Sequence, residues 1–304
     1  MKKYLIIGGA GFIGSHLWLK LLHQGNRVVL VDRTKITPTK EQKSRIKIYS
    51  IDIENAKKVD AVFKKEKPDF VFHLAGPIHL RRDITDPLFL KDVNFLSRTS
   101  IILEACKKHG VKKIIFVSSG GAIYQDAVVV PTPEDYQVHP TLLYGLANMA
   151  IEKFIQLYGK KYKIHFTIAR LSNAYGPGQW QTGIIPATIL KMLKNESPVI
   201  YGNGRQTRDF LYIDDVVSAL IILAQKGSNA IYNIGSGRET SLHEVFLHIK
   251  KMLKSPVVPT HQEITVKETQ RSAMDVKKIK KELGWSPKIS IKEGLLKTIQ
   301  WYGK

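Results

Sequence analysis

The sequence predicts an α/β fold in which a parallel β-sheet carries helices on both faces. Short apolar runs alternate along the first half of the chain with segments of helical periodicity, which is typical of a doubly wound parallel sheet. The first apolar run is followed at once by a cluster of glycines and then by a helical segment. Such a strand–glycine–helix turn occurs where a parallel sheet binds a phosphate-containing ligand.

Six apolar runs are expected to form the strands of this sheet. They are residues 4–7, 27–31, 46–49, 70–74, 113–117 and 165–169. Helical patterns separate them, and the clearest of these are residues 15–22, 55–65, 87–109 and 144–160. Ligands of such sheets bind outside the carboxyl ends of the strands, so we expect the functional residues directly after the apolar runs.

The glycine-rich segment after the first run predicts a dinucleotide site. Gly8 lets the chain turn, Gly11 lets the backbone approach a pyrophosphate, and Gly14 lets the helix pack close to the strand. The helix that follows offers free N–H groups and the positive end of its dipole to the phosphates. Phe12 and Ile13, between the last two glycines, belong to the same predicted contact.

Asp32, which follows the second run, is the expected contact of the adenosine ribose. A carboxylate at this place accepts hydrogen bonds from the ribose hydroxyls, which favours NAD over NADP. The neighbouring Arg33 is able to hold a 2′-phosphate, so the residues alone leave this choice open. The alternative interpretation of Asp32 is a turn carboxylate without a ligand.

Further cofactor contacts are expected after the third, fourth and fifth runs. Asp52, with Ile53 beside it, is placed either to bond the adenine amine or to cap the helix that begins near Asn55. After the fourth run, small residues let the backbone pass close to the cofactor. After the fifth, hydroxyls beside two glycines suit the floor of an open site. These later candidates are Leu74, Ala75, Gly76, Ser118 and Ser119.

The composition argues against several classes of function. A net charge of +21 attracts polyanions, but the lysines are scattered in pairs without an arginine-rich arm or zinc spacing, so we expect neither a nucleic-acid partner nor a metal site. No apolar run reaches the ~18 residues of a membrane span. The chain runs from Met1 directly into the first strand, so no signal peptide is expected. The single cysteine, Cys106, fits a reducing cytoplasm.

The texture of the chain changes after about residue 172, where loops lengthen and helices shorten. We expect a Rossmann-type domain from residues 1–172, to which residues 209–235 return. A smaller C-terminal substrate-binding lobe is expected from residues 173–208 and 236–304.

With these motifs, the chain resembles the extended short-chain dehydrogenase/reductases of the nucleotide-sugar epimerase/dehydratase group, with UDP-glucose 4-epimerases as the closest type. The resemblance covers nearly all 304 residues. It rests further on the segments 170–179, 202–210, 232–237 and 283–287. It implies NAD as the cofactor, a UDP-sugar as the substrate and epimerisation at C4 of UDP-glucose or UDP-galactose as the reaction.

The resemblance also implies a catalytic base, Tyr144. In this group a tyrosine removes a proton from a sugar hydroxyl while hydride passes from the same carbon to NAD, and both return to the other face of the sugar. A free phenol has a pKa of ~10 and is a poor base at neutral pH. The family supplies a lysine four residues later, which stabilises the phenolate and bonds the nicotinamide ribose.

Two positions depart from the family pattern. Asn148 stands where the lysine is expected; its amide is able to bond the ribose but supplies no charge. The next lysine, Lys153, lies on another part of the helix. Gly120 stands where the family carries a catalytic serine or threonine, and Ser119 is the nearest hydroxyl.

Three interpretations of Tyr144 therefore stay open at this point. The first is a working epimerase in which the positive nicotinamide alone lowers the pKa of the phenol. The second is a slow or altered enzyme. The third is a protein that binds NAD and a sugar nucleotide without turnover.

The resemblance places the substrate's diphosphate on Asn173 and Arg208, with Arg271 as a second clamp; the alternative for each arginine is a surface ion pair. Arg81, flanked by His79 and Arg82, corresponds to an arginine of UDP-glucuronate 4-epimerases, so that activity is an alternative. Residues 121–122 are Gly-Ala where 4,6-dehydratases carry an acidic pair, which argues against dehydration.

Members of the group commonly form dimers through two helices of the sheet domain. Here these are the helical segments 87–109 and 144–160, which both carry apolar stripes. The resemblance therefore implies a homodimer.

Overall fold

The computed structural model describes residues 1–76, 94–181, 183–263 and 269–303. It divides into two compact units. The first comprises residues 1–123, 139–170 and 217–232, and the second comprises residues 124–138, 171–216 and 233–304.

These bounds differ from the expected ones mainly at two segments; residues 171–172 and 233–235 also fall in the second unit. Residues 124–138 belong to the second unit, because Thr132 forms a β-bridge with Met274 and its N–H donates to the carbonyl of Ala273 at 2.9 Å. Residues 209–216 also belong there, because Phe210 begins a strand that pairs with Asn173. Both differences arise from long-range pairing that the local sequence does not reveal.

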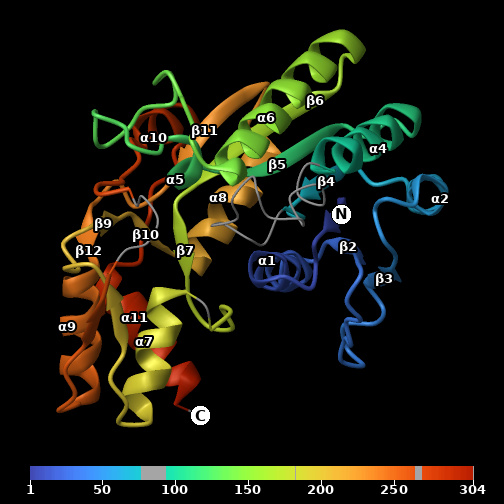
Figure 1. Ribbon diagram of the computed structural model, residues 1–304. Coiled ribbons are helices and arrows are strands. Elements are labelled where there is room, and N and C mark those ends of the chain that lie inside the picture. The colour runs from blue at the N-terminus through green and yellow to red at the C-terminus, as the bar shows by residue number, and fades with distance from the viewer. Residues whose placement is uncertain (77–93, 182, 264–268, 304) are drawn as a thin grey trace. The chain divides into compact units, whose positions relative to one another are not determined.

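A seven-stranded sheet forms the centre of the first unit (Figure 1). Its strand order is β11-β6-β5-β4-β1-β2-β3, and the pairings β3–β2, β2–β1, β1–β4 and β4–β5 are parallel. The predicted doubly wound α/β class is thereby confirmed. The strands are β1 Lys3–Ile7, β2 Arg27–Asp32, β3 Ile46–Ser50, β4 Phe70–His73, β5 Lys113–Ser119, β6 His165–Leu171 and β11 Ala230–Ile234.

Helices lie between these strands, and four of them occupy segments where the periodicity predicts a helix. They are α1 Phe12–His23, α2 Ala56–Glu66, α4 Phe95–Lys108, α5 Gly120–Ile123, α6 Leu143–Tyr162 and α8 Ile213–Lys226. The expected helix at 87–109 is present from Phe95 onward, and residues 87–93 of it lie outside the described part of the chain.

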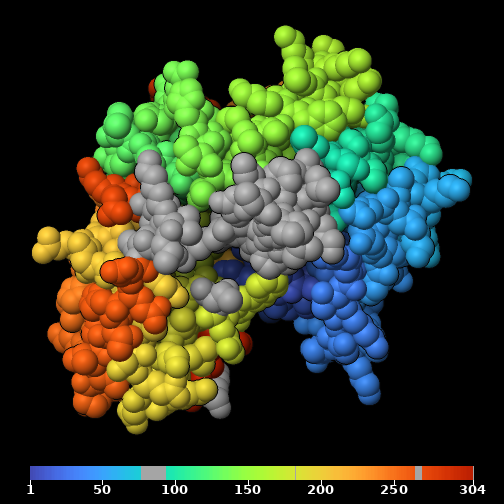
Figure 2. Space-filling view, in the orientation of Figure 1, coloured from blue at the N-terminus to red at the C-terminus, as the bar shows by residue number. Residues whose placement is uncertain are grey.

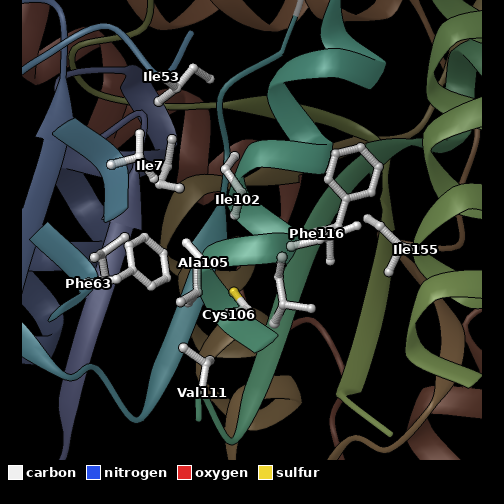
Figure 3. Packing of buried hydrophobic residues seen from close by; sticks show 14 of the residues in the cluster. Ile7, Ile53, Phe63, Ile102, Ala105, Cys106, Val111, Phe116 and Ile155 are labelled. Atoms are coloured by element: carbon white, nitrogen blue, oxygen red, sulfur yellow. The ribbon is translucent and has the colours of Figure 1, made fainter. Parts of the chain in front are cut away.

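The sheet is buried on both faces, which explains why its strands read as continuous apolar runs. Successive residues of a strand point to opposite faces. In β1, Leu5 and Ile7 belong to a cluster with residues of α2, α4 and α6, whereas Tyr4 stacks on Phe70 and Phe72 of β4. Figure 3 shows part of this cluster, with side chains from β1, α2, α4, β5 and α6 in contact.

The second unit contains short strands and five helices or parts of helices in its described residues. Three two-stranded pairings occur, β10–β7, β12–β9 and β13–β8. Beyond α8, its elements are β7 Asn173–Tyr175, α7 Ile184–Leu193, β8 Val199–Tyr201, β9 Thr207–Arg208, β10 Phe210–Tyr212, β12 Thr240–Ser241, α9 Leu242–Leu253, β13 Thr260–Gln262, α10 Lys277–Leu283 and α11 Ile291–Tyr302.

One polar side chain of the sheet core is unusual. His73 is fully buried at the end of β4, where its Nε2 bonds the hydroxyl of Thr99 at 3.1 Å and its Nδ1 has no partner among the described residues. Burial lowers the pKa of this imidazole from 6.5 to about 4, because the protonated form would lose its hydration.

We predict that His73 makes the protein acid-sensitive. Between pH 6.5 and pH 4 the unfolded imidazole binds a proton that the folded one does not, so the free energy of unfolding falls as the pH falls. In urea titrations at pH 7 and pH 5, the wild type should lose about 2 kcal/mol more than His73→Gln, whose amide can keep the bond to Thr99. An equal loss in both proteins would contradict this assignment.

Candidate functional site

The glycine-rich loop lies where the strand order of the sheet reverses, between β1 and β4. The N–H of Gly8 donates to the carbonyl of Val31, and the N–H of Leu74 donates to the carbonyl of Ile7, both at 2.9 Å. Gly8 has φ of +89°, and a Cβ there would lie 3.0 Å from the nitrogen of Ala75. Glycine is therefore required for its conformation and for the close approach of the β4 loop.

The N-terminus of helix α1, which follows this loop, has no side-chain cap. Gly11 is the N-cap and offers no side-chain bond, so the first N–H groups of the helix, beginning with Phe12 and Ile13, receive no side-chain cap. A Cβ at Gly14 would lie 2.2 Å from the carbonyl oxygen of Gly8. The helix can start this close to β1 only because residue 14 is glycine.

Asp32 joins the glycine loop to the end of β2. One carboxylate oxygen accepts the N–H of Ala10 at 2.9 Å, and the other accepts the N–H of Thr34 at 2.9 Å. Arg33 is exposed, and its Nη1 lies 3.9 Å from a carboxylate oxygen of Asp52. The carboxylate is thus fixed beside the loop, where its negative charge disfavours a 2′-phosphate.

Asp52 and Ile53 follow β3, and their side chains make different kinds of contact. The carboxylate of Asp52 accepts the N–H of Glu54 at 2.9 Å, while the cap of α2 is the side chain of Asn55, which accepts the N–H of Lys58 at 3.0 Å. The side chain of Ile53 packs in the hydrophobic cluster of the first unit. Gly76, after β4, has open space around the position of a Cβ.

These observations fit an NAD molecule. The loop without side chains and the helix N-terminus match a pyrophosphate. The fixed carboxylate of Asp32 matches a ribose with two free hydroxyls. When bound, NAD supplies the site with a hydride acceptor and a positive charge on its nicotinamide ring.

Tyr144, Ser119 and Asn148 come together in the first unit. Tyr144 lies in the first turn of α6, Asn148 one turn later, and Ser119 at the end of β5. The side chains of Ser119 and Asn148 both hydrogen-bond the phenol of Tyr144. The amide of Asn148 also donates to the main-chain carbonyl of Tyr144 at 2.8 Å.

The protonation of Tyr144 is governed by burial. Burial raises the pKa of the phenol, and the hydrogen bonds from Ser119 and Asn148 lower it in part. Among the described residues, no cationic side chain contributes to this pKa. The described residues by themselves therefore keep the phenol protonated at neutral pH.

Two glycines shape the surroundings of this group. Gly120 begins the short helix α5 directly after Ser119. Gly145, which sequence analysis did not single out, lies where α6 passes α5: a Cβ there would be 2.3 Å from the carbonyl oxygen of Ala122. Glycine next to Tyr144 thus allows the start of α6 to approach the end of β5.

Ser118 makes a different contact from Ser119. Its hydroxyl is buried and donates to the carboxylate of Glu152 at 2.6 Å. Arg170, at the end of β6, forms an ion pair with the same carboxylate at 2.8 Å. Sequence analysis missed Glu152, although a carboxylate on the face of α6 that carries Tyr144 and Asn148 required a buried partner.

The predicted diphosphate residues lie in the second unit. Asn173 begins β7 and pairs with Phe210 of β10, and its side chain is exposed. Arg208 ends β9, and its Nη1 donates to the carbonyls of Thr207 and Thr269, both at 2.8 Å. The N–H of Asn173 donates to the carbonyl of Asp209 at 2.9 Å, so one short segment connects the two candidates.

Asp209 organises this part of the second unit. Its buried carboxylate accepts the N–H and the hydroxyl of Ser236, at 2.6 and 2.7 Å, and the N–H groups of Gly237 and Met274, both at 3.1 Å. A Cβ at Gly235 would lie 2.5 Å from it. Burial raises the pKa of this carboxyl overall, although the four hydrogen bonds oppose the effect. It ties the Arg208 strand to two distant segments.

Arg271 is engaged in an ion pair. Its Nη2 lies 2.6 Å from a carboxylate oxygen of Glu239, which also accepts the hydroxyl of Thr207 at 2.6 Å. The guanidinium of Arg271 holds the pKa of Glu239 below its usual range. The predicted clamp therefore lies near β9 but is paired with a carboxylate. Arg81, like its neighbours His79 and Arg82, lies outside the described residues.

Two kinds of feature are absent from the described residues. No group of three or more histidine, cysteine, aspartate or glutamate side chains there is arranged to hold a metal ion. None of the helices in the described ranges combines the length and the apolar character needed to cross a membrane.

Comparison with known proteins identifies the family. The profile described as "NAD dependent epimerase/dehydratase family" matches residues 4–235, which include the glycine loop, Tyr144 and Asp209. The chain belongs to this family. Membership confirms the resemblance and makes the protein an NAD-dependent enzyme.

The relatives of this NAD-dependent enzyme match it end to end. A putative UDP-glucose 4-epimerase of Methanocaldococcus jannaschii is 37% identical over 98% of this chain and 97% of its own. The structure of a UDP-glucose 4-epimerase of Thermotoga maritima with UDP-glucose has a TM-score of 0.93 at 34% identity, covering 99% and 98%. That of a Thermus thermophilus UDP-glucose 4-epimerase with NAD has a TM-score of 0.89 at 28% identity, covering 99% and 98%.

We predict that Asp32 sets the preference for NAD. Asp32→Asn removes the charge and keeps the shape, so NAD affinity should fall about tenfold or more, the effect of losing a hydrogen bond to a charged group. NADP affinity should fall less or rise. Calorimetric titration of protein stripped of cofactor measures both, and an unchanged ratio of the two affinities would contradict the role of Asp32.

Proposed function

We propose that this protein interconverts UDP-glucose and UDP-galactose by epimerisation at C4, with NAD bound throughout and Tyr144 as the base. The observation that carries the proposal is the arrangement in which Ser119, at the end of β5, and Asn148, one turn along α6, bond the phenol of Tyr144. Full-length similarity to UDP-glucose 4-epimerases supports the substrate.

The chain's own residues have distinct tasks in this reaction. Tyr144 removes the proton from the C4 hydroxyl as hydride leaves the same carbon, and returns a proton after the keto sugar has turned. Ser119 donates a hydrogen bond to the phenolate of Tyr144. Together with Tyr144, it also hydrogen-bonds the oxygen on C4 of the sugar. Because no described side chain supplies a cation, ionisation of Tyr144 depends on the positive charge of bound NAD.

The second unit is assigned to the nucleotide. Asn173 and Arg208 hold the diphosphate, because guanidinium and amide groups are good phosphate donors. Arg271 also binds the diphosphate when its guanidinium exchanges the carboxylate of Glu239 for a phosphate oxygen. The exposed surface position of this ion pair makes such an exchange inexpensive in free energy.

We also propose a homodimer formed through α4 and α6. Leu96 of α4 and Leu146, Leu157 and Tyr162 of α6 are exposed large apolar side chains. The last turns of α6, yellow-green in Figure 2, lie at the surface. Light scattering distinguishes a dimer from the 34.4 kDa monomer.

The proposed function is tested by cofactor content and turnover. Purified protein should carry NAD, seen in its ultraviolet absorbance, and should convert UDP-glucose to UDP-galactose. Tyr144→Phe should keep the NAD and lose turnover by at least about 100-fold, as for removal of a general base. Tyr158→Phe, which removes a phenol from the same helix, should stay within about twofold of wild type.

Each other outcome of this assay has a clear meaning. Turnover of UDP-glucuronate in place of UDP-glucose would move the substrate assignment to the uronate. Bound NAD without turnover of UDP-glucose, UDP-galactose or UDP-glucuronate would refute the epimerase proposal.

Asn148→Lys tests whether the missing cation limits the reaction. A lysine at this position should favour the phenolate, so the pH of half-maximal kcat should fall by about one unit, equivalent to about tenfold more phenolate at neutral pH. Asn148→Met, which has similar length without charge, is the matched control and should not lower this pH. If all three proteins have the same pH profile, Asn148 does not limit the ionisation of Tyr144.

A further inference from the structure

We propose that Glu152 is a positioning residue for proton transfer at Tyr144, because its buried carboxylate clamps helix α6 to the ends of β5 and β6. This inference rests on the proposed function of Tyr144. It concerns a residue that does not bond the phenol of Tyr144; its contact on β5 is Ser118, a predicted neighbour of the cofactor.

The clamp is built from three buried side chains. Glu152 is 1% exposed and accepts the hydroxyl of Ser118 at 2.6 Å. Arg170 donates from Nη2 at 2.8 Å and from Nε at 3.1 and 3.2 Å. A buried charge that loses its partner is strongly destabilising, so the three groups hold one geometry.

The clamp and the base share one face of one helix. Tyr144, Asn148 and Glu152 are spaced four residues apart on α6 and therefore lie along the same side. Their partners on β5 are adjacent, because Ser118 bonds Glu152 and Ser119 bonds Tyr144. The end of β5 is thus attached to α6 at two points separated by two turns. Rotation or sliding of the helix cannot break one attachment without straining the other.

This coupling matters because the base has little other support. The groups that face the phenol in the described residues are Ser119 from β5 and Asn148 from α6, and neither is charged. Hydrogen bonds weaken steeply as their angle and length depart from the optimum. A small displacement of α6 would therefore leave Tyr144 harder to ionise, without affecting how the nucleotide is held.

The test is a titration of Tyr144 itself in the NAD-loaded protein. Tyrosines carrying ¹³C at Cζ are observed by NMR, and the Tyr144 signal among the 12 tyrosines is assigned by its loss in Tyr144→Phe. The apparent pKa of Tyr144 should rise by about half to one unit in two variants. They are Glu152→Gln and Ser118→Ala, of which the second keeps the Glu152–Arg170 ion pair. The value of kcat at pH 7 should fall about three- to tenfold, with KM unchanged.

Glu66→Gln is the matched control. Glu66 is another buried carboxylate of the first unit, on α2, and it accepts the phenol of Tyr49 at 2.6 Å. Its replacement should lower the melting temperature without moving the Tyr144 titration. A wild-type titration in Ser118→Ala, or an equal shift in Glu66→Gln, would overturn the proposal.

The titration and the turnover assay separate the two proposals. The titration needs bound NAD but no substrate, so absence of epimerisation would refute the proposed function and still leave the clamp tested. If Glu152→Gln does not fold, Ser118→Ala alone carries the test. NAD content measured in each sample confirms that the variants are compared in the same loaded state.

Discussion

Among the described residues, no cationic side chain lies beside the phenol of Tyr144, and the proposed function depends on this constraint. Burial at the start of α6 disfavours the phenolate of Tyr144, and the side chains that oppose this effect are an amide and a hydroxyl. Hydrogen bonds from neutral groups lower a pKa less than an adjacent positive charge does. In the proposed reaction, ionisation of Tyr144 therefore depends on accurate hydrogen-bond geometry and on the positive charge of the bound cofactor.

Several contacts within the fold fix the positions of the residues that carry the proposed function. Glycine at position 145 lets α6 approach α5, and the Glu152–Arg170 pair holds the helix against β5 and β6. In the second unit, the buried carboxylate of Asp209 does a comparable task for the segment that carries Arg208. In both units, a fully bonded buried carboxylate fixes the residues next to the predicted ligand groups.

NAD as the cofactor and the sheet that binds it could be predicted from the sequence, because the pattern that indicates them is local. Gly8 follows β1, Asp32 ends β2 and Gly14 lies in the first turn of α1, so the strand–turn–helix pattern locates all three. All six predicted strands are present in the sheet.

The other parts of the fold and of the candidate site depend on contacts between residues distant in sequence. The pairing of residues 124–138 with the second unit, the partner of Arg271 and the Ser118–Glu152–Arg170 network join segments that no periodicity connects. Glu152 was detectable in principle, because an acidic residue spaced by fours from Tyr144 and Asn148 needs a buried partner. The identity of that partner required the fold.

The central claim is transient oxidation at C4 with no net change in the cofactor. Its most direct test is incubation of the purified protein with UDP-glucose that carries deuterium at C4. The account predicts UDP-galactose that retains the deuterium at C4, because the hydride that leaves C4 returns to the same carbon. Loss of the label to solvent, or a lack of UDP-galactose from NAD-loaded protein, would contradict it.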